Sequence, residues 1–240
     1  MRTIPFTFDG FAALIAALRA KGYTFADFAS ADSAQRHLIL RHDVDMSLDA
    51  AAEMAAFEAR NGIAATYFVL VRTEFYNPFS EAGRRALRAI RSAGHHIGLH
   101  FDAALHSGHE IESAAARECE LLEAAADAPV NAISFHRPAP GHFAAADRLA
   151  GRLSAYGPRF VTAMGYCSDS RGGWHRGDPL ESTAVVEGRA LQLLTHPIWW
   201  HGPPAPPNER LKLFLAARSW MLDRELSRHC TIHQPADHDR

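Results

Sequence analysis

Two aspartates, one residue apart, follow a short apolar run in the first quarter of the chain. Residues 37–47 read His-Leu-Ile-Leu-Arg-His-Asp-Val-Asp-Met-Ser, so Asp43 and Asp45 stand at the end of the run. An apolar segment of this length, with turn and helix signals around it, is typical of a buried strand in a parallel sheet. Side chains at positions i and i+2 of a strand share one face, about 6.6 Å apart along it. Asp43 and Asp45 are therefore predicted to point the same way.

Two like charges at the end of a buried strand are unfavourable unless a positive group lies beside them. A divalent cation is the commonest group in that position, and the pattern predicts a metal site. The alternative is that one aspartate caps the following helix and the other pairs with Arg41.

Other polar residues with metal-binding or acid–base chemistry also follow predicted strands. They are His100 with Asp102, His136 with Arg137, and His196. The carboxyl ends of parallel strands meet at one rim, where the sites of α/β barrels and open parallel sheets are built. The chain also has 15 histidines, and histidine is both the commonest protein metal ligand and an acid–base group near neutral pH. We therefore expect these side chains to share one site with the two aspartates.

The elements that must position these residues alternate along the chain. Short apolar runs predict strands over 37–46, 65–71, 97–101, 132–136 and 191–194. Helical periodicity predicts helices over 9–21 with Asp9 as N-cap, from Ser47 to 61, from Ser80 to 94, over 111–126, and over a last stripe from Leu211 to Leu226. This alternation predicts an α/β fold with a parallel sheet, most naturally a distorted (β/α) barrel of about seven strands.

The length of 240 residues fits one domain. Within it, residues 1–36 are expected to form a helical lead-in, and the polar segment 235–240 is expected to be flexible.

Composition excludes several classes of protein. The formal net charge is −2 and no basic run stands out, which argues against nucleic acid as a partner. The three cysteines are widely spaced without a Cys-x-x-Cys pair, which argues against a disulfide framework or a thiolate zinc site. The sequence contains no secretory leader pattern and no apolar stretch of membrane-spanning length, so a cytoplasmic location is expected.

Five motifs, in this order along the chain, carry a resemblance to a known family. They are Arg41-His-Asp-Val-Asp45, Gly94-His-His-Ile-Gly-Leu-His100, Phe135-His-Arg-Pro-Ala-Pro140, Tyr166-Cys-Ser-Asp-Ser170 with Trp174, and Leu194-Thr-His-Pro197. Together they resemble the polysaccharide deacetylase superfamily (NodB homology, carbohydrate esterase family 4). Within it, the chain is most similar to a bacterial branch linked to surface-polysaccharide or lipopolysaccharide synthesis.

The resemblance implies roles for the residues that match the motifs. Asp43 would be the general base and His196 the general acid. Asp45 and His100 would be metal ligands. Two further residues would position the acid and the base: Arg137 would orient Asp43, and Asp169 would orient or tune His196. Trp174 would shape the wall of the site.

The third metal ligand departs from the pattern of the family. It usually follows the histidine matched by His100 by four residues, and that position here is Ala104. His96 and His100 would be about 13 Å apart if both lie in one extended strand, too far to share an ion. His136 is our replacement ligand, although strand alternation would place it opposite Arg137, so an irregular turn is required there. Asp102 is the second choice.

Aromatic residues in the loops near these motifs suit a carbohydrate partner, because sugars stack on aromatic faces. Trp199, Tyr76 and Trp174 are the predicted substrate contacts; core or lid packing is the alternative for each.

Three functions follow as hypotheses. The first is a metal-dependent N-deacetylase of a sugar or sugar-linked intermediate. The second is a hydrolase of other non-peptide C–N bonds on the same scaffold. The third is a non-catalytic carbohydrate-binding or regulatory domain. His–Asp–Asp ligation suits Zn²⁺, Co²⁺ or Mn²⁺ without choosing among them, and Zn²⁺ is the metal that we expect.

Overall fold

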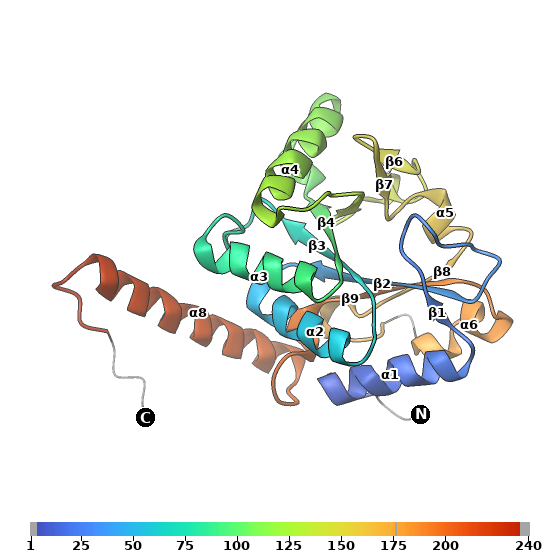
Figure 1. Cartoon of the computed structure of the whole chain (residues 1–240), viewed down its shortest axis with the longest axis horizontal. Coiled ribbons are helices and arrows are strands. Elements are labelled where there is room, and N and C mark those ends of the chain that lie inside the picture. The colour runs from blue at the N-terminus through green and yellow to red at the C-terminus, as the bar shows by residue number, and fades with distance from the viewer. Residues whose placement is uncertain (1–3, 176, 236–240) are drawn as a thin grey trace. The chain divides into compact units, whose positions relative to one another are not determined.

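A curled sheet organises the first part of the chain in the computed structural model, which describes residues 4–175 and 177–235 (Figure 1). The chain forms two compact units, Met1–Gly202 and Pro203–Arg240. The strands of the described residues are β1 (Thr24–Phe25), β2 (His37–Val44), β3 (Thr66–Leu70), β4 (His96–Phe101), β5 (Ala132–Phe135), β6 (Arg148–Leu149), β7 (Arg152–Ser154), β8 (Gly165–Ser168) and β9 (Leu191–Thr195).

Helices follow most of these strands. They are α1 (Phe8–Ala20), α2 (Leu48–Arg60), α3 (Glu81–Ser92), α4 (Ile111–Ala126), α5 (Pro158–Val161), α6 (Thr183–Glu187), α7 (Pro197–Trp200) and, in the second unit, α8 (Pro207–His229). Short 3₁₀ turns are η1 (Ala103–Leu105), η2 (Gly108–Glu110), η3 (Pro140–His142), η4 (Ser170–Gly172) and η5 (Pro179–Glu181). Helices α2, α3 and α4 come after β2, β3 and β4, and α2 packs on α3, which packs on α4 (Figure 1).

The strand order is β6-β7-β5-β4-β3-β2-β9-β8, with β1 paired to the start of β2. Pairing is parallel throughout, apart from the antiparallel pair β6–β7. Gln192 on β9 donates to the carbonyl oxygens of Ala155 and Phe160, which follow β7, at 3.1 and 3.2 Å. These hydrogen bonds join the two ends of the sheet across its inner face. The predicted distorted (β/α) barrel is thus confirmed as a curled, open half-barrel.

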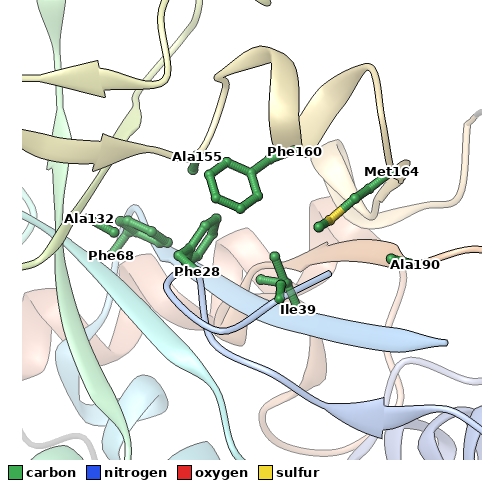
Figure 2. Close-up of a cluster of buried hydrophobic side chains, with 9 residues drawn as sticks. Phe28, Ile39, Phe68, Ala132, Ala155, Phe160, Met164 and Ala190 are labelled. Atoms are coloured by element: carbon green, nitrogen blue, oxygen red, sulfur yellow. The ribbon is translucent and has the colours of Figure 1, made fainter. Parts of the chain in front are cut away.

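The inner face is filled by a cluster of buried apolar side chains from distant parts of the chain (Figure 2). Phe28 packs edge-on against both Phe68 of β3 and Phe160 of α5. Gly98 on β4 allows this packing, because a Cβ there would lie 2.5 Å from the Phe68 ring. The packing of Phe68 therefore requires a glycine at position 98, two residues before His100.

The N-caps of α2 and α3 are those that the sequence predicts. Ser47 Oγ accepts from the Ala50 amide at 3.1 Å, and Ser80 Oγ accepts from the Gly83 amide at 3.0 Å. Helix α1 differs from the prediction: its N-cap is Thr7, two residues before Asp9, and Thr7 Oγ1 accepts from the Gly10 amide at 3.1 Å. Each cap satisfies an amide that has no partner inside its helix.

A fully buried polar network fixes α2 to the sheet. The carboxylate of Glu58 lies 2.9 Å from His42 Nε2 and accepts a 2.6 Å hydrogen bond from the Tyr67 hydroxyl. His95 Nε2 lies 3.0 Å from the carbonyl oxygen of Ala55. His42 alternates with Arg41 and Asp43 along β2, so this network occupies the face of the strand opposite to that of the two aspartates. His42 and His95 thus have a packing role.

The second unit consists of α8 and its flanking segments in the described residues. Several large apolar side chains of α8 are exposed, among them Leu213, Trp220 and Leu222. No helix in the described part of the chain combines the length and apolar character needed to span a bilayer. Of the predicted flexible segment 235–240, residues 236–240 lie outside the described part.

Candidate functional site

A cavity of about 360 Å³ opens at the carboxyl ends of the central strands. The predicted acid–base and ligand residues line it together: Asp43, Asp45, His100, His136, Arg137 and His196. Phe135, Tyr156, Tyr166, Trp199 and the loop after β8 supply most of the remaining wall. The cavity forms where it does because β2, β4, β5 and β9 run in the same direction and end at one rim.

Asp45, His100 and His136 bring three potential ligand atoms into one group. Asp45 Oδ1 lies 3.0 Å from His100 Nε2 and 3.4 Å from His136 Nδ1, and the two nitrogens are 3.2 Å apart. Ligands held about 2.0–2.2 Å from a common ion, at angles of about 90–109°, are roughly 2.8–3.6 Å from one another. The three atoms therefore fit a single small divalent cation.

The hydrogen bond on the far side of His100 fixes its tautomer. Nδ1 lies 3.2 Å from the backbone carbonyl oxygen of Ser134, which can only accept, so Nδ1 carries the proton. With a cation bound between the two residues, the lone pair of Nε2 would face the ion, as metal-ligating histidines require. Burial alone would raise the pKa of Asp45, but its hydrogen bonds to His100 and His136 hold that pKa well below its usual value. Asp45 is therefore an ionised carboxylate at neutral pH.

His136 joins this group because β5 ends in an irregular turn. The strand stops at Phe135, and the His136 amide still donates to the carbonyl oxygen of Phe101 at 2.8 Å. The next residue, Arg137, has φ of 51°, in the left-handed region. This turn breaks the alternation of side chains along the strand, as the prediction of His136 as a ligand requires.

The two other candidates for the third ligand lie elsewhere. Asp102 pairs with Arg137, and its Oδ1 accepts from the Ala104 amide. His96 begins β4, has a side chain 61% exposed, and lies 3.7 Å from Asp27. The extended path of β4 carries His96 away from His100, as the strand spacing predicts.

Asp43 is the partner of Arg41, and here the structure corrects the sequence-based expectation. Arg41 Nη2 lies 3.0 Å from Asp43 Oδ2, and both side chains are almost completely buried. Ser134 Oγ lies 3.3 Å from both oxygens of the same carboxylate. Arg137, expected to orient Asp43, contacts Asp102 instead. The cause is local: Arg41 and Asp43 share a strand face, whereas the turn after β5 directs Arg137 to β4.

The guanidinium of Arg41 is enclosed by polar and aromatic partners. It donates to Gln192 Oε1 at 3.1 Å and to the Tyr156 hydroxyl at 3.0 Å, and its central carbon lies 4.7 Å from the centroid of the Tyr156 ring. Burial alone would lower the pKa of Arg41, but the charge of Asp43 raises it above its usual value. Arg41, Ser134, Gln192 and Tyr156 were not predicted as site residues. Arg41 could have been found from the sequence, because it stands two residues before Asp43 on the same strand. Side chains at that spacing lie on the same face of a sheet.

His196 and Asp169 form a second buried acid–base pair. His196 Nδ1 lies 2.6 Å from Asp169 Oδ1, and the His196 amide and Trp200 Nε1 both donate to Asp169 Oδ2, at 3.1 and 2.7 Å. Burial alone would lower the pKa of His196, but the adjacent Asp169 carboxylate raises it to about 9. Nε2 of the ring faces the ligand group, 3.8 Å from Asp45 Oδ2. The arrangement holds a protonated imidazole at the edge of the cavity.

The three aromatic residues predicted to contact substrate lie in different environments. Trp199 lines the cavity. Trp174 packs against Phe6 and Trp200, with ring centroids 6.0 and 6.2 Å away, and is not among the lining residues. The Tyr76 hydroxyl donates to the Val44 carbonyl oxygen at 2.6 Å and accepts from the Leu70 amide at 2.9 Å. Tyr76 thus ties the ends of β2 and β3 together, because its ring reaches back to the strands.

Comparisons with known proteins show distant structural likenesses. No protein-family model and no curated protein matches the sequence. Among solved structures, a family 4 carbohydrate esterase from Bacillus anthracis is similar, with a TM-score of 0.45, 13% identity, and coverage of 86% of each chain. A chitin deacetylase from the fungal pathogen Colletotrichum lindemuthianum has a TM-score of 0.44, 12% identity, and coverage of 75% of this chain and 81% of its own.

A family 4 pseudoenzyme from Bacillus anthracis is also similar, with a TM-score of 0.41 and 13% identity; the match covers 78% of this chain and 62% of that protein. The relationship is distant in every case.

Proposed function

We propose that this protein is a metal-dependent hydrolase that removes the acetyl group from an N-acetylated sugar or a polysaccharide or lipopolysaccharide intermediate. One observation carries the proposal. A cluster of three ligand-type side chains lies between a buried Asp–Arg pair and a buried His–Asp pair, and all three features face one cavity. Hydrolysis of an amide needs an electrophile, a proton acceptor and a proton donor together.

Asp45, His100 and His136 would hold the ion, and one carboxylate with two imidazoles suits Zn²⁺, with Co²⁺ or Mn²⁺ as alternatives. Such an ion, when bound, supplies a Lewis acid that polarises the acyl carbonyl and lowers the pKa of water. The contact of His100 Nδ1 with the Ser134 carbonyl oxygen keeps the ligand nitrogen aimed at the centre.

Asp43 is the proton acceptor in this proposal. Its carboxylate is held in position by Arg41, and it borders the cavity beside the ligand cluster. It would take the proton of the attacking water. A positioned base of this kind typically contributes about 10²–10⁴-fold to the rate.

His196 is the proton donor. An amine is a poor leaving group unless it receives a proton as the C–N bond breaks. The Asp169 carboxylate keeps His196 protonated and orients its ring, so that Nε2 can deliver the proton to the departing nitrogen.

The test combines metal analysis with product analysis. Protein purified without chelators should contain close to one divalent metal per chain, and Asp45→Asn and His100→Ala should lose it. Metal-loaded protein should then release acetate from members of a panel of N-acetylated sugars. Equal metal content in wild type and both variants would refute the metal site, and metal-loaded protein that releases no acetate would refute the deacetylase.

The non-catalytic alternative keeps one specific observation in its favour. The side chain of Asp43 is only 3% exposed and already has Arg41 and Ser134 as partners, as expected of a structural residue. This alternative predicts sugar binding without acetate release. Release of amines other than deacetylated sugars would instead favour a hydrolase of other non-peptide C–N bonds.

A further inference from the structure

Two arginines at the mouth of the cavity have no role in the chemistry described so far. Arg137 follows β5 and Arg171 lies in η4, after β8, and both line the cavity. Both side chains reach solvent: the Arg137 side chain is 64% exposed, and Arg171 is also exposed. The two residues come from strands that are not neighbours in the sheet, so the fold brings two cationic groups to one opening.

Arg137 forms an ion pair with a buried carboxylate. Its Nη2 contacts Oδ2 of Asp102, a residue only 6% exposed, whose Oδ1 is in turn fixed by the Ala104 amide. A guanidinium has five N–H donors in a rigid fork. Asp102 engages one end of that fork, and the remaining donors of the exposed group are available at the cavity.

Arg171 has no carboxylate within ion-pair distance in the described part of the chain. The carboxylates of the centre already have partners, since Asp43 pairs with Arg41 and Asp45 contacts two histidines. The guanidinium of Arg171 at the cavity mouth therefore has no ion-pair partner among the described residues. A metal ion in the cluster would add positive charge to the same cavity.

Both arginines also adopt a backbone conformation that side chains rarely take. Arg137 has φ of 51° and Arg171 has φ of 62°. Left-handed geometry is unfavourable for an L-residue other than glycine. Arg137 in addition precedes Pro138, a position that favours extended backbone. Glycine would fit both places more easily, and strain of this kind concentrates at binding sites.

We propose that Arg137 and Arg171 form an oxyanion-binding subsite, so that the N-acetylated sugar bound here carries a phosphate or carboxylate group. Arginine forks bind both groups through paired, charge-assisted hydrogen bonds. Ser168 and Ser170 line the same wall with their hydroxyl oxygens 2.6 Å apart, so one hydroxyl donates to the other and the second can donate to a ligand oxygen. The inference rests on the proposed function for the identity of the sugar, but the subsite itself can be tested by binding alone.

The experiment compares equilibrium binding of three sugars to the full-length, metal-loaded protein by calorimetry. The probes are N-acetylglucosamine, N-acetylglucosamine 1-phosphate and N-acetylmuramic acid, which are neutral, phosphorylated and carboxylated. At least one charged sugar should bind ten-fold or more tightly than the neutral one. Comparison of the two charged sugars distinguishes a phosphate site from a carboxylate site.

Arg171→Gln and Arg137→Gln should each reduce the preference for the charged sugar about ten-fold or more. Arg88→Gln removes an exposed arginine on α3, away from the cavity lining, and should leave the preference unchanged. Metal content and thermal stability are measured for each variant. Oxyanion binding by the metal alone would survive both cavity variants and would overturn the proposal, as would equal binding of all three sugars. A preference that persists in one variant removes that arginine from the subsite.

Acetate release measured in parallel separates this inference from the proposed function. Arginine-dependent binding of charged sugars without acetate release would support the subsite and refute the deacetylase. Deacetylation of neutral and charged sugars with equal kcat/KM would support the deacetylase and refute the subsite.

Discussion

Asp43 and Asp45 share a strand face, yet their surroundings separate them into two chemical roles. Asp43 faces a buried arginine that has no other carboxylate partner in the described residues. Asp45 faces two imidazole nitrogens that can instead bind an ion. The ion-pair interpretation thus fits Asp43, and the metal-site interpretation fits Asp45. A buried pair and a ligand cluster only two residues apart suit a proton acceptor beside an electrophile.

Replacement of Asp43 tests the proton-acceptor role. Asp43→Asn keeps the shape of the side chain and removes the acceptor, so acetate release should fall by at least about 10² with metal content intact. Because the variant leaves the buried Arg41 unpaired, the free energy of unfolding should also fall, by about 3–5 kcal/mol. Turnover is therefore measured on folded, metal-loaded protein. Asp49→Asn, on the exposed side of α2, is the matched control; unchanged turnover in Asp43→Asn would remove Asp43 from the mechanism.

The pKa of His196 predicts a pH-dependent stability in the metal-free protein. In the folded state Asp169 raises the pKa of His196 to about 9, above an unfolded value of about 6.5. The stabilisation is therefore complete below about pH 6.5 and is lost as the pH rises through 9. Between these two pKa values the free energy of unfolding should fall by roughly 1.4 kcal/mol for each pH unit. Urea unfolding of chelator-treated wild type and His196→Gln should show a stability difference that shrinks from pH 6 to pH 9.5.

The exposed His109 supplies the control for this measurement, because His109→Gln should follow the wild-type curve at every pH. A difference between wild type and His196→Gln that does not change with pH would show that the Asp169 pair does not shift the His196 pKa.

Among the elements of the fold, the end of β5 decides the composition of the ligand cluster. A regular strand would send His136 and Arg137 to opposite faces. The left-handed turn at Arg137 instead leaves His136 beside His100 and directs Arg137 to Asp102. One irregular backbone position thus sets both the third potential ligand and the cavity-mouth arginine.

The same element provides a comparison between two histidines. His136→Ala removes a ligand and should weaken Zn²⁺ binding sharply, by about 10-fold or more. His96→Ala, at the start of β4, should leave the affinity nearly unchanged, because its side chain contacts Asp27 rather than the cluster. Competition with a chromophoric chelator measures both affinities. The reverse order of effects would mean that His96, and not His136, completes the site.

At the scale of the whole molecule, a metal ion should act as a stabilising ligand of the first unit. The cluster joins β2, β4 and the end of β5, which are brought together only in the folded chain. A ligand at 100 times its Kd stabilises by about 2.7 kcal/mol, which corresponds to a rise in Tm of roughly 5–10 °C for a chain of this size.

Thermal unfolding of chelator-treated protein with added Zn²⁺ checks this expectation. The rise in Tm should be present in wild type and His96→Ala and absent in Asp45→Asn. A rise that persists in Asp45→Asn would place the stabilising ion elsewhere.

The sequence alone was sufficient for the five central strands, for the longer helices α1, α2, α3, α4 and α8, and for several residues of the candidate site. Strands 37–46, 65–71, 97–101, 132–136 and 191–194 each correspond to a strand of the structure within a few residues, because apolar runs and serine caps are local signals. Asp43, Asp45, His100 and His196 meet at one rim because parallel strands align their carboxyl ends. By contrast, no local pattern indicates β8, since Gly165–Ser168 lacks an apolar run and is a strand only by pairing with β9.

Pairings within the site depended on the tertiary structure. Whether Asp43 binds Arg41 or Arg137, and whether His136 or Asp102 joins His100, depends on the backbone turn after β5 and on the curl of the sheet. Gln192 and Tyr156, which hold Arg41, lie more than a hundred positions from it in the sequence. Side-chain partners at such separations are set by how the strands are ordered and twisted. No local pattern encodes that order, because hydrophobic periodicity specifies which face of an element is buried and not which element covers it.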